Sequence, residues 1–153
     1  MVQIWTREEY YKKKGNVGIY WKDNCPFCDR ENQKWQIVWK WKNWFLIHNM
    51  FPYSWTEKHI MAVPYEHKLY STDLNDEELL EMKDIYKFVK EYFWDEKYFS
   101  CTRESIANRS VEHIHMHFIP GKLQWKYLRK MLENQWFPIV QELDITQKNI
   151  LTF

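Results

Sequence analysis

Three histidines occupy every second position in the segment VEHIHMHFIP, which spans residues 111–120. They are His113, His115 and His117, half of the six histidines in the chain. Imidazole titrates near neutral pH and serves as an acid, a base, a nucleophile or a metal ligand. Burying three imidazoles together is costly unless each has a partner, so a purely structural cluster is a poor explanation. We therefore take this segment as the candidate functional site.

Apolar residues fill the positions between and after the histidines, and such strict alternation predicts a β-strand over residues 112–119. Successive side chains of a strand point to opposite faces, so all three imidazoles should share one face. Neighbouring histidines would then lie about 7 Å apart, too far for all three to bind one metal ion on a flat strand. Separate roles along an extended ligand are the better expectation.

The composition limits the kind of site that the chain can carry. Its 153 residues suit one domain with a real core, and its net charge of +1 argues against a general polyanion-coating protein but not against a local phosphate site. With 3 glycines it has neither a GxxxxGK[ST] nor a GxGxxG phosphate loop. We find no signal peptide and no apolar run long enough for a membrane span, so we expect no membrane partner. Three cysteines favour a reducing compartment, and the expected location is cytoplasmic.

The sequence pattern predicts an α+β fold around the histidines, with an antiparallel sheet of about five strands and two main helices. Alternating or apolar runs predict strands at residues 35–39, 44–47, 59–63, 98–103 and 112–119. Apolar residues at helical spacing predict a helix over residues 79–93, with Asp73 or Asn75 as its cap, and a second helix over residues 123–136. A short helix is expected over residues 6–14.

Three blocks of the sequence together resemble the histidine-triad superfamily. Its pattern His-φ-His-φ-His-φ-φ, with φ apolar, is present at residues 113–119. The stretch NMFPYSWTEKHIMAVPYEH at residues 49–67 resembles a block of the dinucleoside-tetraphosphate hydrolase and phosphorylase-like members, and CPFC at residues 25–28 resembles the C-x-F-C of zinc-containing members. The resemblance implies a histidine-triad domain at 23–122, an N-terminal extension at 1–22, and a C-terminal helix and tail at 123–153 packed on the same domain.

The resemblance also implies a mechanism for the triad. His115 would attack the α-phosphorus of a nucleotide and form a covalent nucleotidyl-histidine, which water or another acceptor then releases. The chemistry is reasonable because neutral imidazole is a good nucleophile and protonated imidazole a good leaving group. The backbone carbonyl of His113 would fix the tautomer of His115, and His117 would contact the phosphate or the leaving group.

Three further residues are assigned to nucleotide binding by the same resemblance. Ser110 matches a hydroxyl that contacts the phosphate or leaving group, and Asn49 matches the residue that holds the ribose hydroxyls. Arg109 stands where the family has glutamine, and its guanidinium is suited to pairing with phosphate. The alternative for Arg109 is a solvated loop charge. Asn108 replaces the family's glycine, and asparagine tolerates a left-handed backbone better than most residues.

Cys25 and Cys28 have CxxC spacing, but no second CxxC exists to complete a tetrahedral site. The resemblance implies that His67 and His113 complete a structural Cys2His2 zinc site. A thioredoxin-like redox pair or two idle thiols are the alternatives, although no βαβ pattern accompanies the CxxC. The remaining histidine and cysteine candidates, which we expect to be structural, are His48, His59 and Cys101.

Three functions remain open at this point. The leading one is a hydrolase that cleaves a dinucleoside polyphosphate or nucleoside phosphoramidate, most readily one containing adenosine, through His115. The second is a nucleotidyltransferase or phosphorylase that passes the nucleotidyl group to phosphate. The third is a non-enzymatic, zinc-stabilised nucleotide-binding module. The resemblance also implies a homodimer, for which residues 35–44 and the tryptophans at 125 and 136 offer apolar surface, and no nucleic-acid partner is expected.

Overall fold

The computed structural model describes residues 9, 12, 20, 22–29, 31, 34–52, 58–94, 97–104, 109–121, 129, 132 and 133. The chain divides into two compact units, Met1–Leu123 and Gln124–Phe153, and the elements that carry the site belong to the first. The helices predicted over residues 6–14 and 123–136 lie almost entirely outside the described residues.

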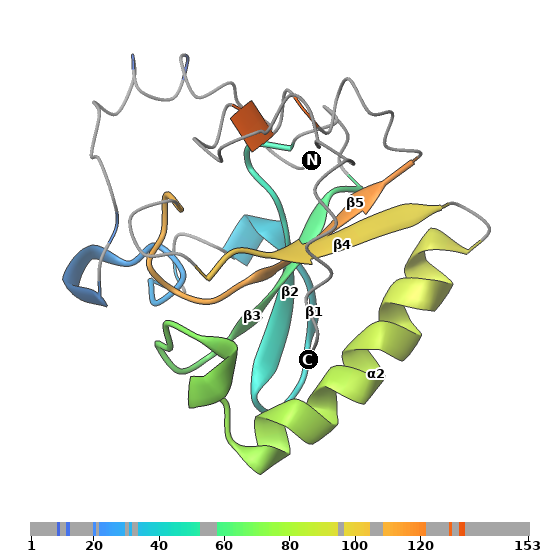
Figure 1. Ribbon diagram of the computed structural model, residues 1–153, viewed down its shortest axis with the longest axis horizontal. Coiled ribbons are helices and arrows are strands. Elements are labelled where there is room, and N and C mark those ends of the chain that lie inside the picture. Colours follow the sequence, from blue (N-terminus) through green and yellow to red (C-terminus); the bar gives the residue numbers. More distant parts are fainter. Residues whose placement is uncertain are drawn as a thin grey trace, which may run out of the picture. The chain divides into compact units, whose positions relative to one another are not determined.

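The first unit is built on a five-stranded antiparallel sheet with the strand order β1-β2-β3-β5-β4 (Figure 1). The strands are β1 Ile37–Lys40, β2 Trp44–His48, β3 Ile60–Pro64, β4 Tyr98–Thr102 and β5 Met116–Pro120. The helices are the long α2, Asp76–Phe93, and three short 3-10 helices, η1 Lys22–Asn24, η2 Lys34–Gln36 and η3 Ser71–Asp73. The predicted α+β class and the antiparallel sheet are confirmed, with one long helix among the described residues.

Helix α2 begins where its capping residues place it. The Asn75 side chain accepts a hydrogen bond from the Glu78 amide at 2.9 Å, and the Glu78 carboxylate accepts one from the Asn75 amide at 2.8 Å. This capping box satisfies two amides that a helix start otherwise leaves unpaired. Glu78 is also buried and paired with Lys68, so the helix start is tied to the loop after β3.

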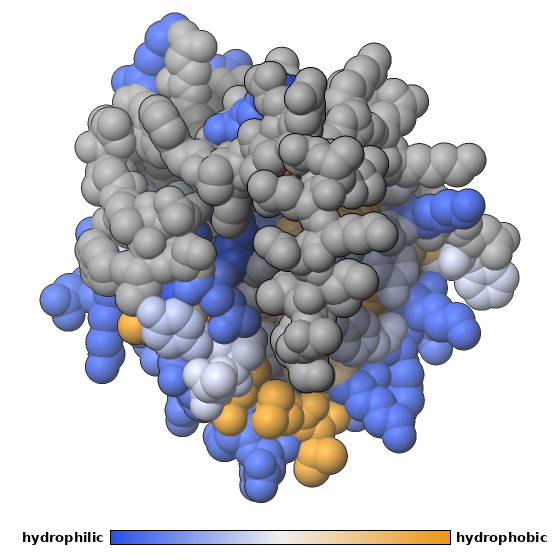
Figure 2. Space-filling model, viewed as in Figure 1, coloured by the Kyte–Doolittle hydropathy of each residue, from blue (hydrophilic) through white to orange (hydrophobic). Residues whose placement is uncertain are grey.

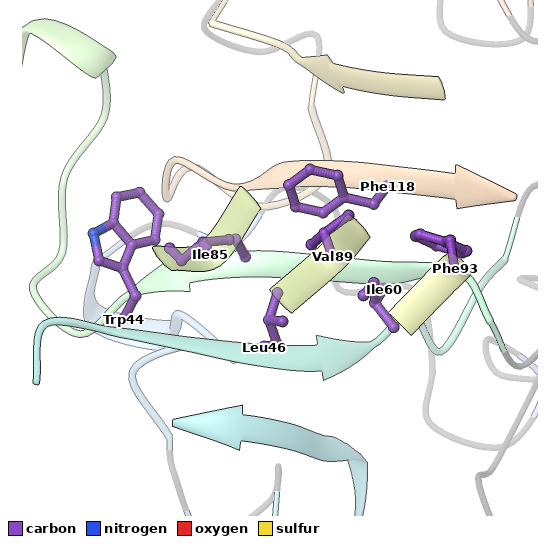
Figure 3. Packing of buried hydrophobic residues seen from close by; sticks show 8 residues of the cluster. Trp44, Leu46, Ile60, Ile85, Val89, Phe93 and Phe118 are labelled. Carbon is purple, nitrogen blue, oxygen red and sulfur yellow. The ribbon is translucent and has the colours of Figure 1, made fainter. Parts of the chain in front are cut away.

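One face of the sheet packs against α2. Ile85, Val89 and Phe93 of the helix lie over Leu46 and other buried residues of the strands (Figure 3). Truncating such a fully buried side chain to alanine typically destabilises a protein by about 2–5 kcal/mol. Because the helix covers this face, the opposite face of the sheet remains for the loops that hold the histidines.

The predicted strand over the triad is shorter than expected. Strand β5 begins at Met116, so His117 lies in the sheet while His113 and His115 lie in the segment before it. The predicted strand therefore covers only His117 of the three histidines, although the rings of His115 and His117 lie 4.8 Å apart between centroids. The backbone before Met116 bonds to loops instead: the Ile114 amide donates to the Lys68 carbonyl at 2.7 Å.

Apolar side chains are also present on the surface. Figure 2 shows them gathered at the lower end of the face in view, where α2 begins, and Leu79 and Leu80 near that end of the helix are 50% and 76% exposed. Trp35 is 85% exposed just before β1. Among the described residues, no helix combines the length and the apolar character that a bilayer crossing requires.

Candidate active site and metal-binding cluster

The strand register places His117 on the face of the sheet that α2 does not cover. His117 lies opposite Met61 of β3 and Cys101 of β4, whereas its neighbour Met116 packs toward the core under α2. A second apolar cluster supports this face, including Met61 and Phe27 from the CPFC segment. The site thus has a rigid, apolar base.

The segment that leads into the triad is held by an earlier part of the chain. The Tyr20 amide donates to the Ser110 carbonyl at 3.0 Å, and the Tyr20 carbonyl accepts from the Glu112 amide at 2.7 Å. Tyr20 and Val111 thereby form a parallel bridge outside the main sheet. These bonds replace the strand ladder that the sequence pattern predicted for this segment.

His115 is held in one tautomer. Its Nδ1 lies 2.7 Å from the His113 carbonyl oxygen, and because a carbonyl only accepts, Nδ1 carries the proton. The lone pair is then on Nε2. Burial lowers the pKa of His115 to about 4, so its ring is neutral at neutral pH. The Phe27 ring contacts it edge-on with 5.1 Å between centroids, and the arrangement gives a positioned, neutral nucleophile.

His117 is paired with a histidine that we had expected to be merely structural. His59 Nε2 and His117 Nδ1 are 3.1 Å apart, and both side chains are buried. Burial lowers the pKa of His59 to about 3 and that of His117 well below its usual value, so both rings are neutral and one donates to the other. The side-chain nitrogen Nδ2 of Asn49 lies 3.3 Å from His59 Nε2.

His59 could have been noticed in the sequence. It comes directly before the apolar run of β3, where a buried imidazole needs a polar partner. What the sequence does not supply is the identity of that partner, because His117 lies 58 residues further along the chain. Only the pairing of β3 with β5 brings the two together.

The four candidate metal ligands converge although they are far apart in sequence. One ligand atom from each of Cys25, Cys28, His67 and His113 lies within 4.8 Å of the others. His113 Nδ1 lies 3.4 Å from Cys25 Sγ and 3.7 Å from Cys28 Sγ, and His67 Nδ1 lies 3.4 Å from Cys28 Sγ. Tetrahedral zinc with its usual bond lengths places sulfur and nitrogen ligands about 3.5 Å apart, so these residues fit zinc.

The chemistry of the ligand set points the same way. His113 Nε2 lies 3.1 Å from the Pro64 carbonyl oxygen, so Nε2 carries the proton and Nδ1 presents its lone pair to the cysteines. Burial lowers the pKa of His113 to about 3, which keeps it in the neutral form that binds metal. Burial raises the pKa of the Cys25 thiol to about 12, and a buried thiolate needs a nearby cation.

Arg109 is not the solvated loop charge that we weighed as its alternative. It is 2% exposed, its Nε donates to Glu112 at 2.8 Å, and its Nη1 donates to the Arg103 carbonyl at 2.9 Å. The guanidinium also lies 5.9 Å from the centre of the Tyr70 ring. Its Nη2 is buried and has no hydrogen-bond partner among the described residues. Glu112, the buried carboxylate that pairs with Arg109, was not predicted as a site residue, because nothing in the sequence around it indicates that it is buried.

Of the other two predicted binding residues, Asn49 contacts His59. Asn49 is buried, and its side-chain oxygen accepts from the Phe51 amide at 2.9 Å while its nitrogen faces His59. Ser110 is half-buried beside Arg109. Asn108 and the tryptophans at 125 and 136 lie outside the described residues.

Comparison with known proteins gives likeness in structure but not in sequence. The sequence matches no protein-family model and no curated protein. Solved structures with the same fold include a zinc-bound histidine triad family protein from Mycobacterium smegmatis, which is 19% identical with a TM-score of 0.56 over 69% of this chain and 80% of that one. A HIT family hydrolase from Legionella pneumophila is 22% identical, with a TM-score of 0.53 over 67% and 97%. A histidine triad nucleotide-binding protein from Candida albicans is 20% identical, with a TM-score of 0.52 over 72% and 93%. The chain therefore has the histidine-triad fold.

Proposed function

We propose that this chain with the histidine-triad fold is a nucleotide hydrolase that works through a covalent nucleotidyl-histidine at His115. One observation carries the proposal: His115 Nδ1 is held by the His113 carbonyl, so the lone pair of a neutral, buried imidazole is on Nε2. A neutral nucleophile with a fixed tautomer is what attack on phosphorus requires. The same fold and the nucleotide-binding and hydrolase neighbours support this direction.

The reaction proceeds in two displacements at the α-phosphorus. His115 Nε2 attacks, a nitrogen–phosphorus bond forms, and the bond to the leaving group breaks. Water then attacks the adduct, releases the nucleoside monophosphate and returns His115 to its neutral form. Each displacement is easier than direct attack by water, because protonated imidazole is a good leaving group.

The surrounding residues supply orientation and charge. His117, fixed by His59, contacts the phosphate or the leaving group, while Ser110 and Nη2 of Arg109 donate to phosphate oxygens. Asn49 holds the ribose hydroxyls. Preorganised donors of this kind stabilise the charge that develops in the transition state.

Zinc belongs to the proposal as a structural ion held by Cys25, Cys28, His67 and His113. A four-ligand site leaves no position for a water, so the ion, when bound, would tie the CPFC segment to the triad segment. The distances between the ligand atoms and the tautomer of His113 support this assignment.

Two broader features complete the proposal. We expect a homodimer, for which β4 offers a surface as the edge strand of the sheet in the described part of the chain, and Phe99 on this strand is 36% exposed. We also expect a cytoplasmic location, where the three cysteines, which are free in the structure, stay reduced. Light scattering on the purified protein measures the first, and fractionation of cells the second.

The activity is tested by incubating the protein with diadenosine tetraphosphate, with and without inorganic phosphate, and identifying the products. AMP plus ATP formed independently of phosphate supports the hydrolase. ADP plus ATP formed only with phosphate would show a phosphorylase instead. Nucleotide binding without turnover would show a binding module, and His115→Ala serves as the inactive control.

A further inference from the structure

Arg103 lies on the same side of the sheet as His117, although nothing in the sequence pattern singles it out. Cys101 of β4 lies opposite His117 of β5, and directly opposed residues of an antiparallel pair share a face. Arg103 comes two residues after Cys101, just beyond the end of β4 at Thr102, so an extended chain points it to that face.

The charge of Arg103 reaches His117 and the strand beside it. Burial is the main cause that lowers the pKa of His117, and the positive charge of Arg103 contributes to that lowering. Burial raises the pKa of the Cys101 thiol, and the same charge opposes that rise. The guanidinium therefore acts on the side of the sheet that carries His117.

The two arginines are linked but differ in their surroundings. Arg109 donates to the Arg103 carbonyl at 2.9 Å, so the two backbone segments hold a fixed relation. Arg109 is also paired with buried Glu112 at 2.8 Å. The negative charge of Glu112 weakens the attraction of Arg109 for an anionic ligand. Arg103 is half-buried, which leaves its side chain partly accessible to a ligand from solvent.

We propose that Arg103 is a specificity residue that selects an anionic polyphosphate leaving group over a neutral amine at the His115 site. This inference rests on the proposed function and deepens it, because it chooses between the two substrate classes that the triad alone leaves open. The substrate class is then a dinucleoside polyphosphate rather than a nucleoside phosphoramidate.

The selection follows from where charge develops. When His115 Nε2 attacks a dinucleoside tetraphosphate, the P–O bond breaks and the electron pair goes to the departing oxygen of a nucleoside triphosphate, which leaves as an anion. Hydrolysis of the adduct adds one water, so the sum is one monophosphate and one triphosphate. The guanidinium of Arg103 would stabilise that anion. An amine departs from a phosphoramidate only after taking up a proton, and a nearby positive charge does not assist that step.

The test compares two substrates that differ in the charge of the leaving group. We would measure kcat/KM of wild type, Arg103→Gln and Arg103→Lys on diadenosine tetraphosphate and on an adenosine phosphoramidate with a neutral amine. Removing one preorganised donor typically lowers kcat by about 10²–10³-fold. We expect a loss of that size for Arg103→Gln on the tetraphosphate, a much smaller loss on the phosphoramidate, and partial recovery with Arg103→Lys.

Controls separate a charge effect from damage to the fold. Lys87→Gln removes a positive charge from α2, which packs on the opposite face of the sheet, and should leave both rates unchanged. Arg103→Gln keeps the backbone carbonyl that accepts from Arg109. Equal losses on both substrates, or no loss on either, would overturn the inference alone. Wild-type protein that cleaves neither substrate would overturn the proposed function and the inference together.

Discussion

The neutral, buried state of His59 makes a testable contribution to stability. Its side chain is fully buried, and burial lowers its pKa from 6.5 to about 3 in the folded protein. A histidine whose folded pKa is depressed contributes stability that is fully present above pH 6.5 and is lost as the pH falls, because the unfolded chain gains the proton first. The perturbation is His59→Gln, which keeps a polar side chain but removes the titrating group.

The magnitude follows from the two pKa values. At pH 5 the unfolded chain has largely protonated this histidine, and the folded chain has not. The linkage relation then gives a loss of about 2 kcal/mol between pH 8 and pH 5 that belongs to His59. Other groups, the cluster of cysteines and histidines included, also lose stability on acidification, but they do so in wild type and variant alike. The difference between the two proteins therefore reports His59 together with its coupling to His117, whose pKa His59 also lowers.

Urea unfolding at pH 8 and pH 5 measures this difference. We expect wild type to lose about 2 kcal/mol more than His59→Gln between these two values. Ile60→Val, at the neighbouring buried position, should be less stable by about 0.5–1.5 kcal/mol at both pH values and keep the wild-type pH dependence. If His59→Gln and wild type lose the same stability to within about 0.5 kcal/mol, the reasoning about His59 is refuted.

Three further predictions follow from the site. His115→Ala should abolish turnover of diadenosine tetraphosphate while equilibrium dialysis still detects nucleotide binding, and residual turnover would contradict the role of His115 as nucleophile. Cys28→Ser should lose the zinc that elemental analysis finds in wild type, whereas Cys101→Ser should retain it; equal zinc in all three proteins would exclude the cluster as the site. Glu112→Gln leaves a buried arginine charge without its partner and should cost about 3–5 kcal/mol in urea unfolding, while Glu77→Gln at an exposed pair should cost less than about 1 kcal/mol. Similar losses for these two carboxylates would contradict the burial of the first pair.

The fold could be predicted well where local chemistry decides it. The start of α2 could be predicted at Asn75 because its side chain caps the helix. The strands at 44–48 and 60–64 could be predicted because their apolar runs need burial. The error came at the triad, where alternation predicted a strand from residue 112 onward. Alternation reports an extended backbone, but it does not report which partner the backbone bonds to, and here Tyr20 and Lys68 supply it.

The site shows the same division between local and long-range information. The ligand types of the metal cluster could be named from residue chemistry and family resemblance, because cysteine and histidine are the usual ligands of structural zinc. The partner of His117 could not, since it depends on the pairing of β3 with β5. Burial of the Arg109–Glu112 pair is a property of the folded loop, and a charged residue in a loop is solvated in most proteins.

Each histidine of the triad has its role set by which of its two ring nitrogens is hydrogen-bonded to the protein. His113 donates an N–H to the Pro64 carbonyl, and His115 donates one to the His113 carbonyl. One ring nitrogen of His117 is hydrogen-bonded to His59. In His113 the contact is made by Nε2, which leaves Nδ1 for the cysteines; in His115 it is made by Nδ1, which leaves Nε2 for phosphorus. Three identical side chains thus receive different roles from which nitrogen the backbone or a neighbour occupies. The His113 carbonyl, and not the sequence of the ring's own neighbours, therefore fixes the tautomer that makes Nε2 of His115 the nucleophilic atom.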